Sequence, residues 1–440
     1  MPSSSSARWV RLWLIGLNLG LLVTGVALAA TGMRRAQFLL AMVPVVFVPF
    51  AYARLRLHRT LVSAGGDWRG ALWGVIGVAL DAVMVAQLLT ARSPEASAWL
   101  NGSPQGWIGP VWFSAHALLF LGYAVLGLGR ALRRLLRRAL TWRRAPAAAS
   151  DVALVGRREF LQQLGVVGAA APFAVSLSSV PLSYDFRVDE HEIELPHWPP
   201  TLDGLRIAHL SDIHVGGGMN RQRLAEVVAL TQGARPDLIL HTGDFLTHRS
   251  GDFDAPLYEA LARLHAPHGQ WACLGNHDYD DPEGFARKLG SAGVTVLRNR
   301  VATIDIGGQP LEVAGIDFLF GTTRAAAYQR VVAAWPPRRA PRLLLCHDPS
   351  AFAAFPEDSA DLVLSGHTHG GHIGIQLGSG HALTVVSLAG IPDQGVFRRG
   401  DLRLFVTRCV GFYGYPMRVG IPPEIALLVL RAPRRPASPV

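Results

Sequence analysis

The sequence predicts an α/β domain that follows an all-α, membrane-spanning N-terminal region. Long apolar segments with clustered arginines beside them fill the first third of the 440 residues. From about residue 205 onward, short apolar runs of strand length alternate with helical patterns, which is typical of strands buried on both faces of a layered fold. We therefore divide the chain into residues 1–130 (transmembrane), 131–200 (basic linker) and 201–432 (the α/β domain).

The composition agrees with a membrane part, since the apolar fraction is 50% and the mean hydropathy is positive. The formal net charge of +10 could indicate binding to nucleic acid. However, seven arginines crowd between residues 130 and 144, directly after an apolar segment, as they do on the cytoplasmic flanks of membrane helices. We therefore expect no nucleic-acid partner. The three cysteines have no regular spacing and predict no disulfide framework.

Four apolar segments have the length of membrane helices, roughly 17–25 residues. They run near Trp9–Ala30, Ala36–Ala53, Gly70–Thr90 and Trp107–Gly129. The second is short and contains two prolines, so a re-entrant or kinked segment is its alternative. Arginines place the second connection and the stretch after the fourth segment in the cytoplasm. Asp81, inside the third segment, is either a functional carboxyl or a protonated group bonded to a neighbouring helix.

A fifth apolar segment decides which side of the membrane the α/β domain faces. Arg157 and Arg158 precede a weakly apolar run from about Leu161 to Val180. The match to a twin-arginine export signal is incomplete, because Gly156 and Gln162 depart from it; such a signal would place the chain from residue 181 onward outside the cytoplasm. The alternative is a basic amphipathic linker on the cytoplasmic surface. We expect a multi-pass membrane protein with an extracytoplasmic α/β domain.

Six apolar runs of the α/β domain are expected to be strands. They are Leu205–Leu210, Asp237–His241, Gln270–Leu274, Leu311–Ala314, Arg342–Cys346 and Asp361–Leu364. Clusters of Asp, Asn and His follow five of them. Because ligand sites collect beyond the carboxyl ends of parallel strands, we expect these clusters to converge on one edge. Gly243, Gly275 and Gly366 stand directly before cluster residues and would permit tight turns.

In chain order the clusters are Asp-x-His, Gly-Asp, Gly-Asn-His-Asp, His and Gly-His-x-His. This series resembles the signature of the calcineurin-like metallophosphoesterase superfamily. Gly366–Gly371 and Pro423–Ile425 resemble its membrane-anchored bacterial branch. The resemblance covers about residues 200–430 and implies a sandwich of two mixed β-sheets with helices on the outer faces.

The resemblance also implies a site for two divalent metal ions. The ligands would be Asp212, His214 and His369 at one metal, Asn276, His347 and His367 at the other, and Asp244 as a bridge. Nitrogen and oxygen ligands without thiolates suit Mn, Fe or Zn in such a site.

The expected reaction is hydrolysis of a phosphomonoester or phosphodiester. It needs a hydroxide at neutral pH and compensation of charge on phosphorus, which two cations about 3.5–4 Å apart supply. His277 and Asp278 are the predicted catalytic residues: His277 as proton donor or electrostatic stabiliser, and Asp278 as the group that orients its imidazole. His372, where the branch often has Gln, is a candidate substrate contact. Membrane attachment favours a phosphoester at the bilayer or envelope, such as a lipid-linked one.

Two other functions are compatible with these residues. One is a non-catalytic metal-binding scaffold of the same fold, although the sequence keeps every ligand and His277. The other is a transporter or sensor with an enzymatic appendage, which only Asp81 favours, since four helices without a clear repeat give little support.

Overall fold

The computed structural model describes residues 108–140, 154–216, 218–247, 254–321, 324–375, 382–412 and 416–433, with scattered positions between 52 and 83. The chain forms two compact units, residues 1–89 with 108–178, and residues 90–107 with 179–440. Apart from the scattered positions, the first three predicted membrane segments, including Asp81, lie outside the described residues.

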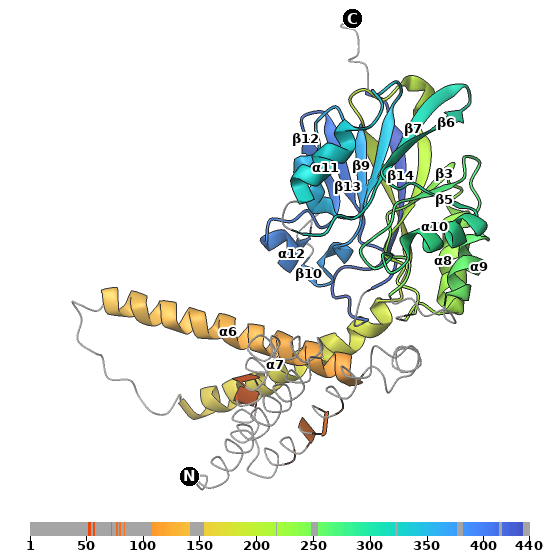
Figure 1. Ribbon diagram of the computed structural model, residues 1–440. Helices are drawn as coiled ribbons and strands as arrows, with labels where there is room; N and C mark the ends of the chain where they lie inside the picture. Colours follow the sequence, from red (N-terminus) through yellow and green to blue (C-terminus); the bar gives the residue numbers. More distant parts are fainter. Residues whose placement is uncertain are drawn as a thin grey trace, which may run out of the picture. The chain divides into compact units, whose positions relative to one another are not determined.

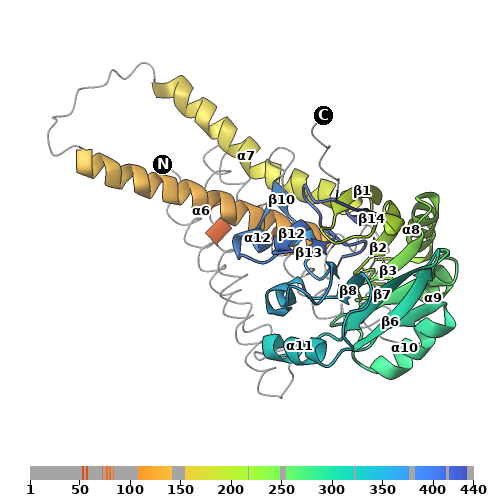
Figure 2. The ribbon, with the colours of Figure 1, turned by 90° about the horizontal axis from the view of Figure 1, so that it is seen from above.

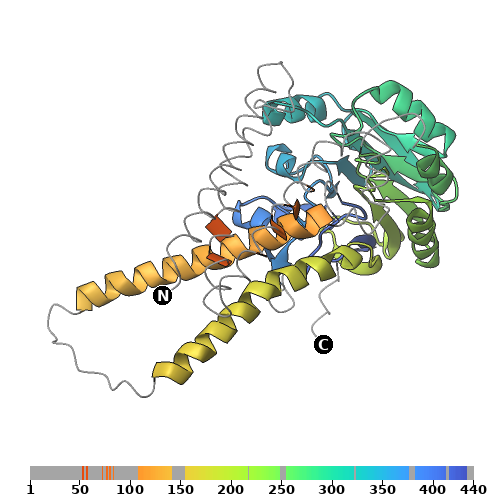
Figure 3. The same ribbon diagram turned by 90° about the horizontal axis from the view of Figure 1, so that it is seen from below.

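Two helices make up most of the described first unit, α6 (Ile108–Leu140) and α7 (Leu154–Leu182). They approach each other where the ring of Phe173 packs 5.7 Å from that of Trp112 (Figure 3). α6 contains the fourth predicted membrane segment and continues into the arginine-rich stretch. Within the described residues, Ser114–Leu136 is the one helical segment long and apolar enough to cross a membrane. α7 contains the fifth predicted segment, of which Ala170–Leu182 is a shorter apolar stretch.

The second unit is a sandwich of two six-stranded mixed sheets with helices on both outer faces (Figures 1 and 2). The first sheet contains, in spatial order, β1 (Arg187–Glu194), β14 (Glu424–Arg431), β2 (Leu205–Leu210), β3 (Leu238–His241), β4 (Gln270–Ala272) and β5 (Val294–Val296). The second contains β12 (Gly395–Arg399), β13 (Leu402–Val406), β9 (Leu362–Ser365), β8 (Arg342–Cys346), β7 (Gln309–Ile316) and β6 (Arg300–Ile306). The predicted two-sheet fold is confirmed.

Helices and a small hairpin complete this unit. The helices are α8 (Arg221–Gly233), α9 (Ala255–Leu261) and α10 (Pro282–Ser291) over the first sheet, and α11 (Arg324–Ala333) with the 3₁₀ turn η6 (Pro349–Ala354) over the second. Two further 3₁₀ turns are η5 (Pro200–Leu202) and η7 (His369–Gly371). The hairpin pairs β10 (Gly374–Ile375) with β11 (Leu383–Thr384) and leads into α12 (Val385–Leu388).

The layering follows from the two-residue period of a strand. In β8, Leu343 and Leu345 pack in the core between the sheets, whereas Leu344 and Cys346 pack under α11 and η6. All five residues of β8 are buried, so this run has no polar alternation, as expected for a strand covered on both faces. The six predicted runs correspond to β2, β3, β4, β7, β8 and β9.

The first sheet also takes in a strand from the region that the sequence assigned to the linker. β1 pairs in parallel with β14, and β14 pairs antiparallel with β2. Glu424, at the start of β14, is buried, and its carboxylate lies 2.7 Å from His191 Nε2 on β1. The C-terminal strand therefore joins β1 to the rest of the sheet.

Candidate metal centre

The predicted ligands lie in loops at the carboxyl ends of parallel strands. β2, β3 and β4 run parallel in the first sheet, and β8 and β9 run parallel in the second. The structure brings six of the seven predicted ligands into two groups, in each of which the candidate ligand atoms lie within 4.8 Å of one another. The groups are Asp212, His214 and His369, and Asp244, His347 and His367.

The two groups form one continuous cluster. His369 Nε2 lies 3.2 Å from Asp212 Oδ1 in the first group, and His347 Nε2 lies 3.3 Å from Asp244 Oδ2 in the second. His214 Nε2 lies 3.7 Å from each of these two carboxylate oxygens. The seventh predicted ligand is also here, since Asn276 Oδ1 lies 3.1 Å from His347 Nε2. Asp244 thus lies between the groups, where the sequence placed the bridge.

The two oxygens of the Asp212 carboxylate have different surroundings: Oδ2 faces protein donors and Oδ1 faces the centre of the cluster. Its Oδ2 accepts hydrogen bonds from Ser211 Oγ at 2.5 Å, His367 N at 2.9 Å and Cys409 Sγ at 3.1 Å. Its Oδ1 is buried and has no hydrogen-bond partner among the described residues. Because a buried carboxylate oxygen without a partner is costly, and Oδ1 faces the imidazoles, this arrangement fits a divalent cation.

Asp244 and Asp278 hold two of the loops together. Asp244 Oδ1 accepts a hydrogen bond from His277 N at 2.8 Å, which leaves Oδ2 to face the imidazoles. Asp278 is fully buried, and its carboxylate accepts hydrogen bonds from the backbone N–H groups of Asp244 at 2.8 Å, Gly275 at 2.9 Å and Phe245 at 3.2 Å. These contacts give Asp278 a role in positioning the Asp244 loop, which the sequence did not indicate.

The imidazoles are oriented by hydrogen bonds from their outer nitrogens. His347 Nδ1–H donates to the carbonyl of Thr242 at 2.6 Å, and His369 Nδ1–H donates to that of Gly411 at 3.3 Å. The Nε2 atoms of both rings therefore face the cluster. His367 Nδ1 lies 3.1 Å from His347 Nε2, so the two nitrogens are close enough to hold one cation in place of a proton.

Electrostatics also favour a cation in the cluster. Burial acts to raise the pKa of Asp244, but the neighbouring His347 and His214 lower it to about 2. Burial acts to lower the pKa of His347, but Asp244 and Asp212 raise it to about 10. Burial and the nearby His347 lower the pKa of His367 to about 4, which keeps that imidazole neutral. The carboxylates that attract a proton onto His347 would attract a cation in the same way.

The backbone around the ligands is strained. Asp212, His214, Asp244, His367 and His369 all have φ between 50° and 69°, the left-handed region that non-glycine residues rarely adopt. Such residues cluster at functional sites. Asp212 and His214 therefore do not continue β2 as extended backbone; they turn the chain, and isolated bridges pair Val215 with Met219 and Leu246.

Glycines let the ligand loops approach one another closely. A Cβ atom on Gly275 would lie 2.2 Å from Asp244 Oδ1, and one on Gly366 would lie 2.3 Å from Asp212 Oδ2. Neither glycine has positive φ, unlike Gly243 at +91°. Space beside the carboxylates, more than turn geometry, therefore requires glycine at positions 275 and 366.

The remaining predicted residues lie beside the cluster. The ring of His277 is 5.2 Å from that of His214, and the ring of His372 stacks 4.8 Å from that of His369. Sequence reasoning missed Arg418, whose buried guanidinium donates to the carbonyls of Gly411 at 2.6 Å and His369 at 3.2 Å. Nothing in the local sequence marks this arginine as buried.

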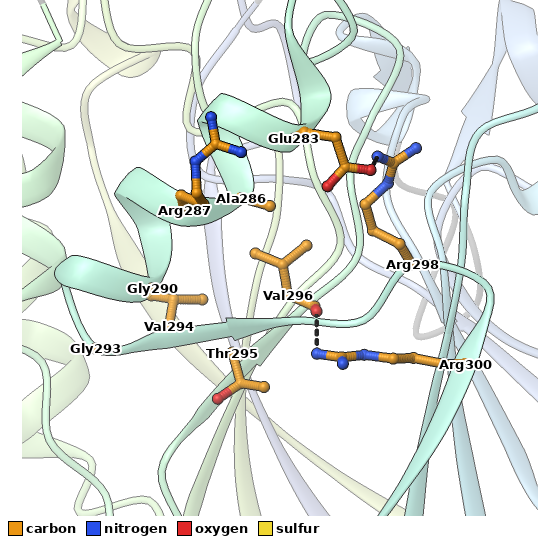
Figure 4. A pocket seen from close by; sticks show the side chains of 10 residues that line it. All are labelled: Glu283, Ala286, Arg287, Gly290, Gly293, Val294, Thr295, Val296, Arg298 and Arg300. Atoms are coloured by element: carbon orange, nitrogen blue, oxygen red, sulfur yellow. Dashed lines mark hydrogen bonds and ion pairs between the residues drawn. The ribbon is translucent and has the colours of Figure 1, made fainter.

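A separate hollow lies between α10 and β5 (Figure 4). Its charged lining includes Arg298, which is paired with Glu283 and Asp317, and Arg300, which donates to the carbonyl of Val296. These guanidinium groups are engaged by protein acceptors, and the hollow holds none of the predicted ligands. The metal centre is thus the stronger candidate site.

Comparisons with known proteins agree with this site. The calcineurin-like phosphoesterase family matches residues 205–371. An uncharacterized metallophosphoesterase of Aquifex aeolicus is 30% identical over 257 residues, which cover 57% of this chain and 93% of that protein. This chain belongs to the calcineurin-like phosphoesterase family. It is therefore a metal-dependent phosphoester hydrolase.

Two further relatives of this phosphoesterase bear on its reaction and location. Phosphodiesterase YaeI of Escherichia coli is 29% identical over 289 residues, which cover 63% of this chain and 100% of that protein. A transmembrane protein with metallophosphoesterase domain from Danio rerio is 31% identical over 261 residues, 56% of this chain and 57% of that protein. The second relative and the apolar span Ser114–Leu136 support membrane association.

Proposed function

We propose that this phosphoesterase holds two divalent cations, Mn, Fe or Zn, and hydrolyses a phosphoester at a membrane. The observation that carries the dinuclear proposal is the place of Asp244, whose Oδ2 faces His347 of one group and His214 of the other. Asp212, His214 and His369 would hold one cation, and Asn276, His347 and His367 the other. When bound, the pair would supply an activated water and a clamp for the phosphoryl oxygens.

The side chains around the cations have separate tasks in this proposal. His277 is the proton donor to the leaving group or a stabiliser of the transition state, since its ring lies beside that of His214 and its backbone N–H donates to Asp244 Oδ1. Asp278 holds the loops of Asp244 and Gly275 together by accepting hydrogen bonds from three backbone N–H groups. The carboxyl of Asp278 is also the group predicted to orient the imidazole of His277, and the Asp278→Ala variant separates the two roles.

Metal analysis with paired variants tests the dinuclear proposal. The full chain in detergent should contain two equivalents of metal and hydrolyse bis(nitrophenyl) phosphate. Asp244→Asn should lose metal together with activity, whereas His277→Ala should keep metal and lose activity. A chain that binds metal but turns over no phosphoester would instead be the non-catalytic scaffold. A single equivalent of metal in an active enzyme would refute the bridging role of Asp244.

The substrate we propose is a phosphoester at the bilayer or cell envelope, including lipid-linked ones, and we place the catalytic domain outside the cytoplasm. The apolar span of α6 and the twin-arginine-like start of α7 support this topology. Reporter fusions after Val180 test it: alkaline phosphatase should be active and a cytoplasmic fluorescent reporter dark. The opposite pattern would mean that the domain faces the cytoplasm.

A further inference from the structure

Four of the exposed large apolar side chains in the second unit, which contains the metal centre, lie on one segment. Among the described residues from 183 onward, the exposed large apolar side chains are Phe320, Ile375, Leu383, Leu388 and Ile391. The last four, here called the apolar rim, are 65%, 45%, 71% and 40% exposed and lie within 17 residues of chain. Single exposed apolar residues are normal on a protein surface, but a concentrated group indicates an interaction site.

Three of the four residues of the apolar rim belong to regular secondary structure. Ile375 and Leu383 are direct partners in the β10–β11 hairpin, so their side chains share one face. The other face of the hairpin is buried through Gly374 and Thr384. Leu388 ends α12, which follows β11 directly, and β10 and α12 lie side by side in two views (Figures 1 and 2).

The same segment carries no charge. Residues 373–392 contain no Asp, Glu, Lys or Arg, whereas 17% of the whole chain is charged. Asp393, the first charged residue after it, is buried and accepts a hydrogen bond from the hydroxyl of Thr384. The rim therefore presents aliphatic side chains without a charged residue among them, which suits an apolar phase better than water.

Residues beside the apolar rim contact a metal-ligand loop. Thr368, between the ligands His367 and His369, donates its hydroxyl to the carbonyl of Asp393 at 2.8 Å. A Cβ atom on Gly371 would lie 2.8 Å from Thr384, so the ligand loop and the hairpin are in close contact. Whatever the rim binds is thereby held next to the metal centre.

We propose that the apolar rim inserts into the surface of a lipid bilayer and presents the metal centre to phosphoester headgroups there. The same chain carries Ser114–Leu136, which is long and apolar enough to cross a membrane, so the catalytic unit is tethered near a bilayer at high effective concentration. Four aliphatic side chains without charge match the apolar face of interfacial membrane anchors. The lipid contact stands on the rim itself; its link to the substrate rests on the function proposed above.

Site-directed fluorescence tests the lipid contact without any need for activity. The three native cysteines are buried, so Leu388→Cys can carry an environment-sensitive probe in the full chain, reconstituted in phosphatidylcholine–phosphatidylglycerol vesicles. Doxyl-labelled lipids should quench this probe and leave a matched probe at Ser291→Cys, exposed at the end of α10, unquenched. The proposal would be overturned by no quenching at position 388 or by equal quenching at both positions. A blue shift at position 388 without lipid quenching would also overturn it, because it means that protein covers the rim.

A pair of substrates tests the catalytic consequence in the same vesicles. The double variant Leu383→Ser/Leu388→Ser should hydrolyse a soluble phosphodiester at the wild-type rate. It should hydrolyse a phosphoester lipid at least about tenfold more slowly than the wild type, since two aliphatic side chains that would enter the bilayer are lost. Equal rates on the lipid, or an equal loss on both substrates, would count against the proposal. A wild-type chain inactive on every phosphoester would refute the proposed function and leave the quenching result standing.

Discussion

Replacing Gly275 by alanine should disable the metal centre through a single methyl group. The added Cβ would lie 2.2 Å from Asp244 Oδ1 and 2.4 Å from Asp244 N, where ordinary contacts are more than 1 Å longer. Backbone cannot move aside as the end of a side chain can, so the Asp244 loop must shift by about 1 Å. Overpacking of this kind costs about 1–3 kcal/mol of folding stability, and a misplacement of 1 Å in a site costs about 10²-fold in rate.

The matched control for Gly275→Ala is Gly290→Ala in the last turn of α10. A Cβ at Gly290 meets no atom within 4 Å, and alanine is the better helix former by up to about 1 kcal/mol. The melting temperature, the metal content and kcat/KM on a soluble phosphodiester should therefore fall in Gly275→Ala. In Gly290→Ala they should stay the same or rise slightly. Full activity and two metal equivalents in Gly275→Ala would refute the argument that space at this glycine sets the position of the bridging carboxylate.

Three further predictions concern separate carboxyl and imidazole groups. Asp278→Ala leaves three buried N–H donors without their acceptor, so the free energy of unfolding, measured with denaturant, should fall by about 3 kcal/mol or more. Metal titration should show weaker binding. Unchanged metal affinity with a lower kcat would mean that the carboxyl acts through the imidazole of His277 instead. His277→Ala should lower kcat by about 10²–10⁴-fold at unchanged metal content, and loss of metal would contradict its assignment as an acid. Burial acts to raise the pKa of Glu424, but His191 helps lower it from 4.5 to about 2. The ionised carboxylate therefore stabilises the fold by about 3 kcal/mol above pH 4.5, and this stabilisation is lost as the pH falls toward 2. Glu424→Gln should show no loss of stability from this group when it is unfolded by acid.

The sequence predicted the strands that end in ligands because they are uninterrupted apolar runs. β8, with all five residues buried, is an example. It did not predict β1, since Asp189, Glu190, Glu192 and Glu194 interrupt any apolar run there. The strand forms because β14 supplies eight paired residues along its length, and such long-range pairing leaves no local mark.

The candidate site shows the same limit. Order and chemistry of the clusters predicted which side chains meet, and the structure places six of them in the groups around Asp212 and Asp244. The local pattern could not show that Asp278 joins two loops, because two of the three N–H groups that it accepts from, those of Asp244 and Phe245, come from a loop over 30 residues away. It could not reveal the left-handed backbone of five ligands either, since packing imposes that strain.

The position of β14 between β1 and β2 has a consequence for biosynthesis. A nascent chain that has not yet released residues 424–431 from the ribosome holds two incomplete edges where the finished sheet is continuous. Assembly of the domain must therefore wait until these residues have left the ribosome, and a ribosome stalled before that point should yield a chain that proteases digest readily.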